Sequence, residues 1–574
     1  MNSAVNEERE SSRQGRTVPV YQALAEDIRR ADVDTVFGLM SDDTAVFATA
    51  LDTIGLDFHG ARHENSAIAM AEGYATASGR LGVAVVGRGP ATANGLHAAV
   101  YASRTGAKVL IIHGEAPFNH GAINTLGPDY KEFDAAGVLS AAGLKSFVAT
   151  SAGAARTALA DALAEAMLGR TVTLRLPTNV QLAEIELPAD DDPVSAAPDA
   201  PALQPPRAHA IDATVALLEK SRKPLIIAGL GAHRAGAKAA LESLAERIGG
   251  LLVTTARGKE MFRGNPYNLG IIGSFSHSVA RRLIDQTDCV LVFGAGLNLL
   301  TTSFGTFVPD VPLVQVDKVR NNIGRWCDAD VAVVGDARLA AEQLLKALPA
   351  RTEAEKPFHT AEVRGSLADF DPADDFQAAP TARTVDPRSL GIELDALLPE
   401  NRDIVYDAGN FLGVVPYLSV PGPDHFKLTT DFASIGIGFG AALGFAKARP
   451  DRTTVLVIGD GGFLMTMGEL ETAAREDLAL IIVLMNDCAY GAELHLLKMR
   501  QLPVSKSVFP DVDFAPVAEA FGFRAVTIRT LDELRALAPL LANPEEPIFL
   551  DCKINADIAA PFMGEFAAFE ASRD

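Results

Sequence analysis

Glycines and a carboxylate follow an apolar run in the last third of the chain. Residues 455–463 read VLVIGDGGF, so Gly459, Asp460, Gly461 and Gly462 stand between that run and a stretch of helical character. Backbone N–H groups of a glycine turn before a helix can approach phosphate oxygens closely. A carboxylate in the turn would repel phosphate unless a divalent cation such as Mg²⁺ lay between them. The pattern predicts a phosphate site with a metal, although Gly-Asp-Gly is also common in ordinary loops.

A second carboxylate follows the next apolar run. Residues 480–485 are all apolar, and Asn486 and Asp487 come directly after them. Because open parallel sheets bind ligands at the carboxyl ends of their strands, we expect Asp487 to reach the same edge as Asp460. The two carboxylates would then share one Mg²⁺ ion, with the backbone carbonyl of Ala489 as a further oxygen ligand.

Short runs of Val, Ile and Leu alternate with Ala-rich helical stretches along most of the chain. The apolar runs at 81–87, 108–114 and 171–177 are examples. This alternation is typical of parallel sheets covered by helices on both faces, so it predicts an α/β protein with three doubly wound domains. Polar stretches between the domains are predicted to be linkers. The predicted boundaries are a disordered tail (1–16), a first domain (17–188), a linker (189–206), a central domain (207–350), a second linker (351–387), a third domain (388–556) and a C-terminal tail (557–574).

The composition restricts the class of protein and its partners. A length of 574 residues exceeds a single hydrophobic core. The 73 acidic residues outnumber the 51 basic ones, and the net charge of −22 disfavours nucleic acid as a partner. No apolar run is long enough to cross a bilayer, and the polar start lacks the apolar core of a signal peptide. Four separated cysteines without CxxC spacing fit a reducing compartment, so we expect a cytoplasmic protein without a membrane partner.

The spacing of the two carboxylate motifs resembles that of a known family. Gly-Asp-Gly at 459–461, twenty-four further residues and then Asn486-Asp487 resemble the fingerprint of thiamine diphosphate enzymes. Over nearly its full length the chain resembles the group of acetohydroxyacid synthase, benzaldehyde lyase and pyruvate decarboxylase. The resemblance implies a pyrimidine-binding, a central and a diphosphate-binding domain in that order, with thiamine diphosphate and Mg²⁺ as cofactors. Asp487 departs from the family pattern, which has a second Asn there, and it adds negative charge near the metal.

The first domain carries a second stretch that resembles the family. Residues 58–80, FHGARHENSAIAMAEGYATASGR, place Glu64 at the position of the catalytic glutamate. The resemblance implies that Glu64 hydrogen-bonds atom N1′ of the aminopyrimidine and promotes the tautomer whose nitrogen deprotonates the thiazolium carbon. Taken alone, a Glu before an Ala-rich helix is more often a capping or solvated carboxylate. The motif in the third domain favours the catalytic interpretation.

Further segments of the third domain match cofactor-binding positions of the family. In the segment 428–450, the resemblance makes Ile435 the apolar wedge between the two cofactor rings and directs the carbonyl of Ala433 to the aminopyrimidine. A Gly- and Ala-rich segment is otherwise typical of a tightly packed helix. The other residues assigned to cofactor binding, besides Gly459, Asp460, Gly461 and Gly462, are Gly409, Asn410, Phe411, Tyr490 and Gly491.

Two regions supply candidates for contact with the substrate. Relatives carry polar substrate-facing residues in the region of 113–134, and His120 is the candidate there. Lys131 stands where the synthases commonly have Gln. Glu493 has the offset of an active-site Glu in pyruvate decarboxylases, where a carboxylate in a closed cleft can relay protons. The alternatives are an ordinary loop residue for His120 and a surface helix residue for Glu493.

Two further glycine-containing segments can be compared with the family. One concerns structural support of the pocket, and the other concerns binding of FAD. The loop at 87–94, GRGPATAN, resembles a Gly-Pro-Gly-x-x-Asn loop of the family, with Ala91 in place of the second Gly, and is interpreted as structural support. The central domain has a lone GxG within 228–236, and FGAGLNLL at 293–300 replaces the arginine-containing flavin contact of the synthases. FAD is therefore a possible cofactor but not an expected one.

The leading hypothesis is a thiamine diphosphate-dependent enzyme that makes or breaks the bond beside a carbonyl. An acetolactate synthase-like carboligase acting on 2-oxo acids, diketones or acyloins comes first, and a 2-oxo acid decarboxylase or non-decarboxylating lyase is the alternative. A cofactor-binding regulatory homologue without turnover is the alternative from another class, against which Glu64 argues. In this family the pocket lies between the pyrimidine domain of one subunit and the diphosphate domain of another, which implies a homodimer or homotetramer.

Overall fold

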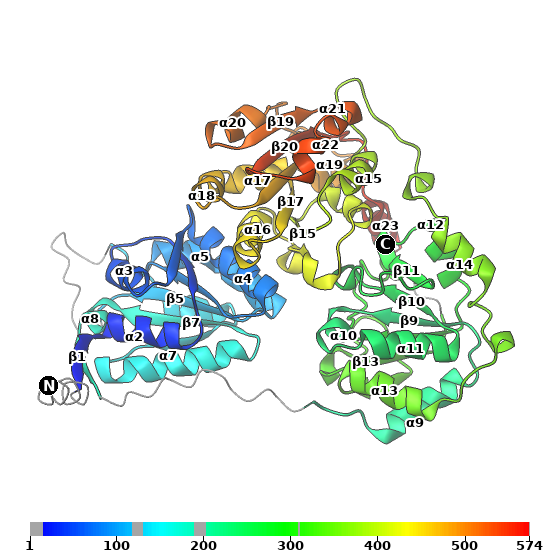
Figure 1. Ribbon diagram of the computed structural model, residues 1–574, viewed down its shortest axis with the longest axis horizontal. Helices are drawn as coiled ribbons and strands as arrows, with labels where there is room; N and C mark the ends of the chain where they lie inside the picture. The colour runs from blue at the N-terminus through cyan, green and yellow to red at the C-terminus, as the bar shows by residue number, and fades with distance from the viewer. Residues whose placement is uncertain (1–14, 118–129, 189–202, 308–309, 573–574) are drawn as a thin grey trace, which may run out of the picture.

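The computed structural model describes residues 15–117, 130–188, 203–307 and 310–572. Three six-stranded parallel sheets, each flanked by helices, lie in three successive domains, as Figure 1 shows. This arrangement confirms the predicted fold class of three doubly wound α/β domains. Among the described helices, none combines the length and the apolar character needed to cross a membrane.

The first domain is built on strands that are buried on both faces. All five residues of its third strand are buried, which explains the continuous apolar run in the sequence. The sheet order is β3 (Asp57–Gly60), β2 (Thr35–Gly38), β4 (Gly82–Val86), β5 (Val109–Glu115), β7 (Thr171–Pro177) and β6 (Lys145–Val148). The principal helices are α2 (Val20–Arg30), α3 (Ala45–Thr53), α4 (Glu64–Ser78), α5 (Pro90–Thr105) and α7 (Ala152–Met167).

The third domain repeats the strand order of the first. In both sheets, numbering the six strands of each domain along the chain gives the order 2-1-3-4-6-5. The third sheet consists of β16 (Phe426–Leu428), β15 (Arg402–Tyr406), β17 (Thr453–Gly459), β18 (Leu480–Asn486), β20 (Ile548–Lys553) and β19 (Arg524–Ile528). Its helices include α15 (Pro387–Leu397), α16 (Ile437–Ala448), α17 (Asp460–Thr466), α18 (Glu469–Arg475), α19 (Gly491–Met499) and α20 (Ala515–Ala520).

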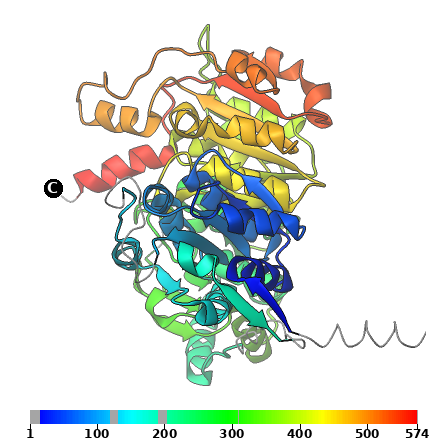
Figure 2. The same cartoon turned by 90° about the vertical axis from the view of Figure 1, so that its left-hand side faces the viewer.

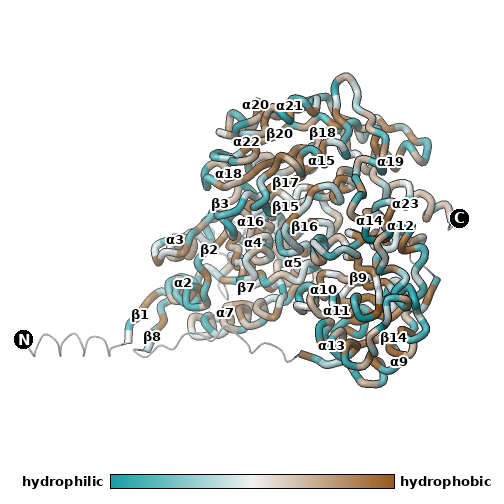
Figure 3. The backbone as a smooth tube through the Cα atoms, turned by 45° about the vertical axis from the view of Figure 1, so that its right-hand side comes forward, coloured by the Kyte–Doolittle hydropathy of each residue, from teal (hydrophilic) through white to brown (hydrophobic). Residues whose placement is uncertain are grey.

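The central domain has a different strand order, 3-2-1-4-5-6 on the same numbering. Its sheet consists of β11 (Asn268–Ile271), β10 (Leu251–Thr254), β9 (Pro224–Ala228), β12 (Cys289–Phe293), β13 (Leu313–Asp317) and β14 (Val331–Val334). It is covered by α9 (Ala208–Leu218), α10 (Leu230–Arg234), α11 (Lys238–Ile248), α12 (Ser278–Ile284) and α13 (Ala337–Ala347). In Figure 3 hydrophobic segments run through the interior of the molecule, and hydrophilic segments lie mostly at the outside.

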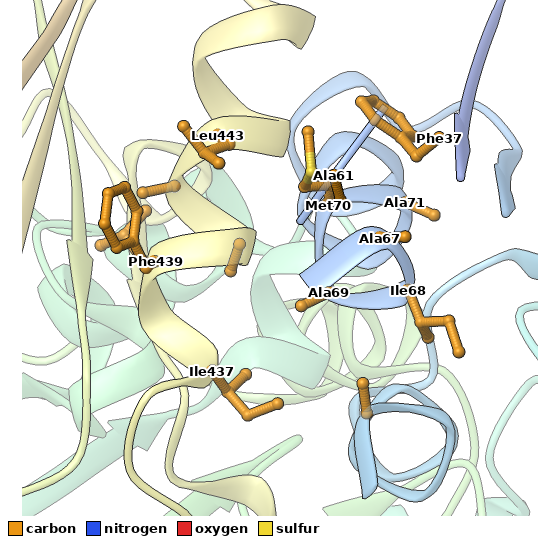
Figure 4. Packing of buried hydrophobic residues seen from close by; sticks show 14 of the residues in the cluster. Phe37, Ala61, Ala67, Ile68, Ala69, Met70, Ala71, Ile437, Phe439 and Leu443 are labelled. Carbon is orange, nitrogen blue, oxygen red and sulfur yellow. The ribbon is translucent and has the colours of Figure 1, made fainter. Parts of the chain in front are cut away.

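Helices α4 and α16 join the first and third domains. Figure 4 shows them side by side, and one hydrophobic cluster includes residues of both. Glycines permit this close approach: a Cβ atom on Gly73 would lie 2.2 Å from the carbonyl oxygen of Ala441, and one on Gly444 would lie 2.1 Å from that of Met70. Figure 2 turns the first domain toward the viewer, with the third domain above it.

Three segments predicted as tails or linkers contain regular structure. Arg16 begins β1 (Arg16–Pro19), which pairs with β8 (Glu184–Leu187), because strand pairing satisfies its backbone groups. The range 351–387 includes α14 (Ala361–Ala368), and Phe358 within it is buried against the central domain. The last residues form α23 (Pro561–Ala571), where Phe562 and Met563 supply apolar contacts that an Ala-rich tail does not suggest.

Candidate active site

A cavity of about 320 Å³ lies at the carboxyl ends of the third sheet. It brings together segments that follow β15, β17 and β18, so residues far apart in the sequence meet at one edge. The predicted residues that line it are Gly409, Asn410, Phe411, Ala433, Ile435, Gly459, Asp460, Gly461, Gly462, Asp487, Ala489, Tyr490, Gly491 and Glu493. Residues that the sequence did not single out also line it, namely Leu300, Ala408, Leu412, Thr430, Met485, Ala492 and Phe562.

Close packing explains the glycines of the turn after β17. A Cβ atom on Gly461 would lie 2.6 Å from the ring of Tyr490, and one on Gly462 would lie 2.5 Å from a carboxylate oxygen of Asp407. Gly459 is the N-cap of α17, and Asp460 is the first residue of the helix. The turn therefore presents backbone N–H groups and a helix N-terminus to the cavity, as a phosphate site requires.

Asp460 and Asp487 form a pair of carboxylates in this cavity. Asp460 is 3 % exposed, and burial raises its pKa to about 7. The pKa of Asp487 is also raised, first by burial and then by the charge of Asp460. The backbone N–H of Ala489 donates to Asp487 over 3.1 Å, and a Cβ atom on Gly491 would lie 2.3 Å from the other carboxylate oxygen.

This donor set fits a hard divalent cation. Two neighbouring buried carboxylates repel one another, and a cation between them would neutralise both. Among the described residues no group of three or more His, Cys, Asp or Glu side chains is arranged to hold a metal ion. The two carboxylates and a backbone carbonyl would therefore supply the protein ligands here. Such an oxygen-only set, completed by water and phosphate oxygens, suits Mg²⁺ rather than Zn²⁺.

The loop before α16 is fixed by a buried carboxylate that sequence reasoning missed. Asp407 is fully buried and accepts N–H bonds from Gly436 at 2.6 Å and from Gly438 at 3.0 Å, and it also accepts the Thr429 hydroxyl at 3.2 Å. Burial raises its pKa to about 6. Ala433 has a left-handed φ of 52°, which such bonds help to hold. An Asp at the end of an apolar strand was the available signal, but its partners lie 22 or more positions away.

The segment before the C-terminal helix closes one side of the cavity. The side-chain amide of Asn410 donates to the carbonyl of Ile558 at 2.9 Å, and its oxygen accepts the N–H of Ala560 at 2.8 Å. Phe562 of α23 lines the cavity and contacts Phe275 of the central domain, with ring centroids 6.4 Å apart. The side chain of Asn410 therefore anchors the C-terminal segment beside the cavity.

Glu64 lies elsewhere in the same chain. It is the first residue of α4, its side chain is 13 % exposed, and it accepts a hydrogen bond from Nδ2 of Asn94 at 3.1 Å. No described residue of the first domain lines the cavity of the third domain. The predicted catalytic glutamate and the predicted cofactor cradle are thus separate within one chain. Asn94, the last residue of the predicted loop at 87–94, lies in the first turns of α5, so this helix rather than a loop supports Glu64.

Two of the three remaining candidates, Lys131 and Glu493, lie within the described residues. His120 lies outside the described residues. Lys131 pairs with Asp42 and lies 3.8 Å from Asp43, beside the carboxyl edge of the first sheet. Glu493 lies in the first turn of α19, exposed at the cavity of the third domain. His113 is buried in β5, 3.2 Å from the Thr92 hydroxyl, and burial lowers its pKa to about 4, so it is a neutral core residue.

The glycines of the central domain border open space. Gly231 of the lone GxG lines a cavity of about 760 Å³ together with Asp317 and Trp326. That cavity shares Gly294 and Gly296 with a second cavity, of about 400 Å³, which extends to residues of the third domain. These cavities do not test whether FAD binds, and its expected absence stays a prediction.

Comparison with known proteins decides the family. Three family models match successive parts of the chain: "Thiamine pyrophosphate enzyme, N-terminal TPP binding domain" over 19–138, "Thiamine pyrophosphate enzyme, central domain" over 211–344, and "Thiamine pyrophosphate enzyme, C-terminal TPP binding domain" over 407–552. The chain belongs to the thiamine pyrophosphate enzymes. This assignment confirms the predicted family and its organic cofactor, thiamine diphosphate.

Curated relatives of this thiamine pyrophosphate enzyme carry different activities in their names. The chain is 28 % identical to a probable acetolactate synthase large subunit of Methanocaldococcus jannaschii, over 94 % of this chain and 93 % of the relative. It is 29 % identical to a probable 2-ketoarginine decarboxylase of Pseudomonas aeruginosa, over 90 % and 91 %. It is 26 % identical to a sulfoacetaldehyde acetyltransferase of Rhodobacter capsulatus, over 94 % and 95 %. All three names are those of enzymes, in agreement with the prediction that this chain is one.

Proposed function

We propose that this protein is a Mg²⁺- and thiamine diphosphate-dependent carboligase that resembles acetolactate synthase and acts on 2-oxo acids, diketones or acyloins. The observation that carries the proposal is the single cavity in which the glycine turn, the Asp460–Asp487 pair and Ile435 meet. The relatives named acetolactate synthase support carboligation as the reaction.

The residues of the third domain hold and orient the cofactor in this proposal. Backbone N–H groups of the turn at 459–462 bind the diphosphate, and Asp460, Asp487 and the carbonyl of Ala489 hold Mg²⁺. Ile435 supports the bend between the two rings. Bound thiamine diphosphate supplies a carbon nucleophile for the substrate carbonyl and an electron sink for the bond beside it.

Glu64 controls one proton. Its carboxylate, oriented by Asn94, holds the proton at N1′ of the aminopyrimidine and thereby sets the tautomer of that ring. Phe562 and the segment it belongs to exclude water from the reacting side of the cavity. Glu493, which lines the cavity, exchanges a proton with bound substrate in this proposal.

The active site is completed by a second copy of the chain. Glu64 lies outside the cavity within one chain, and exposed apolar residues on α17, Leu464 at 48 % and Met465 at 59 %, adjoin the glycine turn. A partner's first domain placed there would bury these residues and bring its glutamate to the aminopyrimidine. A homodimer is the minimum assembly, and a homotetramer is the larger form expected. Some relatives are named as large subunits, so a separate small subunit is a further candidate partner.

A decarboxylase is the second candidate, favoured by the relative named 2-ketoarginine decarboxylase and by Lys131 in place of the synthases' Gln. The two candidates differ in the fate of the activated substrate. A carboligase joins it to a second carbonyl, whereas a decarboxylase protonates it and releases an aldehyde. A non-decarboxylating lyase would instead release an aldehyde from an acyloin.

Titration and product analysis test these proposals. We expect thiamine diphosphate to bind only when Mg²⁺ is added in a calorimetric titration of metal-depleted protein. Incubation of the loaded protein with pyruvate and other 2-oxo acids, diketones and acyloins should then give a carboligation product, identified by mass. An aldehyde as sole product would establish the decarboxylase or lyase instead. Metal-independent binding would contradict the assignment of Asp460 and Asp487.

A further inference from the structure

Another cavity, of about 500 Å³, is lined by residues of the 3-10 helix η6 (Asn410–Tyr417) and of α23, the two elements that also contribute to the cofactor cavity. It is enclosed by the central domain, the 370–376 segment, the end of η6 and α23. We call it the junction cavity. Its volume falls in the range of small-molecule sites, about 300–1,000 Å³, and such sites occur preferentially at domain interfaces.

The junction cavity contains a buried cation with weak partners. Lys259 is 3 % exposed, and its ammonium lies 3.4 Å from the carbonyl of Pro416 and 3.9 Å from the carboxylate of Glu260. These distances are long for an ammonium group with three donors. Glu260 has a left-handed φ of 62°, a strained backbone conformation for such a residue. Burial lowers the pKa of Lys259, and an anion beside it would oppose that effect.

The two other cationic side chains of the junction cavity, the guanidinium groups of Arg281 and Arg388, already have carboxylate partners. Arg281 lies 3.1 Å from Glu565, and Arg388 lies 2.6 Å from Asp386. A ligand carboxylate therefore meets least competition at Lys259.

A hydroxyl group of the junction cavity lacks a hydrogen-bond partner among the described residues. The hydroxyl of Ser276 is buried and has no hydrogen-bond partner among the described residues. An unsatisfied buried hydroxyl costs about 1–3 kcal/mol. Burial raises the pKa of Tyr417, which also lines the cavity, to about 12, so its hydroxyl remains a donor at neutral pH. A ligand with acceptor oxygens would satisfy such donors.

Aromatic side chains supply the apolar surface of the same cavity. Phe275, Phe370, Phe376 and Tyr417 line it. His277 stacks on Phe370 with ring centroids 4.2 Å apart. Apolar walls with a few convergent polar groups are the usual composition of a small-molecule site.

From this arrangement we propose that the junction cavity is an effector site for a small monocarboxylic acid with an aromatic or branched apolar body. The ligand's carboxylate pairs with Lys259, the hydroxyl of Ser276 donates to it, and its body contacts the aromatic side chains. This inference goes beyond the proposed reaction and does not depend on which carbonyl substrate is used.

Two elements connect the junction cavity to the cofactor cavity. Residues 410–412 of η6 line the cofactor cavity, whereas Gly413, Pro416 and Tyr417 of the same element line the junction cavity. Phe562 of α23 faces the cofactor cavity, and its neighbour Pro561 lines the junction cavity. A ligand that packs against one end of these elements changes the free energy of arranging the other end, so effector and cofactor affinities are coupled in both directions.

Calorimetric titration of the full-length protein, saturated with thiamine diphosphate and Mg²⁺, tests the site with phenylacetate as probe. Phenylacetate has no oxo group next to its carboxylate, so it is not a substrate of the proposed reaction. We expect one saturable site per chain, and affinity for the neutral analogue phenylacetamide at least about tenfold weaker, because a charge-assisted hydrogen bond is lost. We also expect saturating phenylacetate to change the dissociation constant of thiamine diphosphate severalfold, measured separately with Mg²⁺ present.

Variants assign the binding to the junction cavity. Lys259→Met should weaken phenylacetate binding at least about tenfold, Lys259→Arg should retain most of it, and Ser276→Ala should weaken it by a smaller factor. If Lys259→Met does not fold, the Ser276→Ala variant and the phenylacetamide comparison still decide the matter. Absence of saturable binding, competition by thiamine diphosphate, or unchanged affinity in both variants would overturn the site. An unchanged cofactor affinity would overturn the effector role. None of these results depends on carboligase turnover, so they are separate from a failure of the proposed function.

Discussion

The first and third domains share one strand order but carry different chemistry at equivalent positions. After the second strand, the first domain begins α4 with Glu64, whereas the third domain forms the Ala433–Gly436 loop before α16. After the third strand, the first domain has Arg88, whose backbone and side chain contact Asp43, whereas the third domain has Asp460 in a glycine turn. In the proposed function, one architecture therefore provides a proton-controlling carboxylate in one domain and an anion and metal cradle in the other.

The difference between the two domains shows that strand order decides where a site lies, whereas the local residues decide its chemistry. In the third domain, the glycine turn and the second carboxylate at 487 line one cavity, which would hold diphosphate and metal in the proposed function. In the first domain, Glu64 accepts a hydrogen bond from Asn94, and neither residue lines the cavity of the third domain. The two sheet edges therefore have different expected roles. Substitutions in the first domain should lower turnover, and substitutions in the third domain should weaken cofactor binding.

The largest expected effect is a loss of turnover without a loss of cofactor affinity. Glu64→Gln removes the carboxylate of the first-domain edge, so turnover should fall by about a thousandfold, because control of a transferred proton typically contributes about 10²–10⁴-fold. The affinity for thiamine diphosphate with Mg²⁺ should stay within a few fold, because the third-domain cradle is untouched. Steady-state kinetics and calorimetry on the same preparation check both halves. Equal turnover, or equal deprotonation of the thiazolium carbon, in the variant and the wild type would contradict the proposed role.

The opposite behaviour is expected at the third-domain edge. Asp460→Ala should weaken Mg²⁺-dependent binding of thiamine diphosphate by about a hundredfold or more, because a metal-bound carboxylate is removed. The cofactor-free protein should not be destabilised, because the change also relieves repulsion with Asp487. Calorimetric titration measures the first effect, and thermal unfolding without metal is the control. Loss of stability in the cofactor-free variant would show that Asp460 is a structural residue.

The third domain should also show a pH-dependent contribution to the free energy of unfolding, from the buried carboxylate of Asp407. The pKa of Asp407 is raised from 3.8 to about 6 by burial. Because the folded state holds this proton more tightly than the unfolded state, the contribution of Asp407 to stability falls as pH rises from about 4 to 6. The expected loss is about 2 kcal/mol. Asp407→Asn should remove that part of the pH dependence when cofactor-free protein is unfolded by denaturant at several pH values. Parallel pH profiles for variant and wild type would refute it.

The same comparison explains which parts of the site could be predicted from the sequence. The glycine turn, Asp460 and Asp487 lie in local motifs directly after apolar strands, so strand polarity alone brings them together. Asp407 was missed because its function depends on backbone N–H groups of a remote loop. The role of Asn410 in anchoring residues 558–560 depends on tertiary contacts across 148 or more positions. Composition cannot reveal such contacts.

The segments outside the sheets show the same limit. Helix α14 in the predicted linker packs its Val363 and Leu367 against the central domain, where Phe358, just before the helix, is buried. The surrounding segment 351–387 is polar and rich in Asp and Ala, and it gives little sign of that burial. Helix α23 is likewise held by tertiary contacts. Phe562 packs in the interior, and Glu565 accepts hydrogen bonds from Ser274 and Arg281. Regular structure here follows from packing rather than from periodicity.

The smallest expected effect concerns the residue that orients Glu64. Asn94 donates to its carboxylate at 3.1 Å, so Asn94→Ala should leave the glutamate in place but less well positioned. Turnover should fall by about tenfold, with little change in the affinity for thiamine diphosphate, because one hydrogen bond to a charged group is lost. The double variant with Glu64→Gln distinguishes positioning from an independent role. If Asn94 acts through Glu64, adding Asn94→Ala to Glu64→Gln should lower turnover much less than it does in the wild type, whereas additive losses would assign Asn94 a contact of its own with the cofactor.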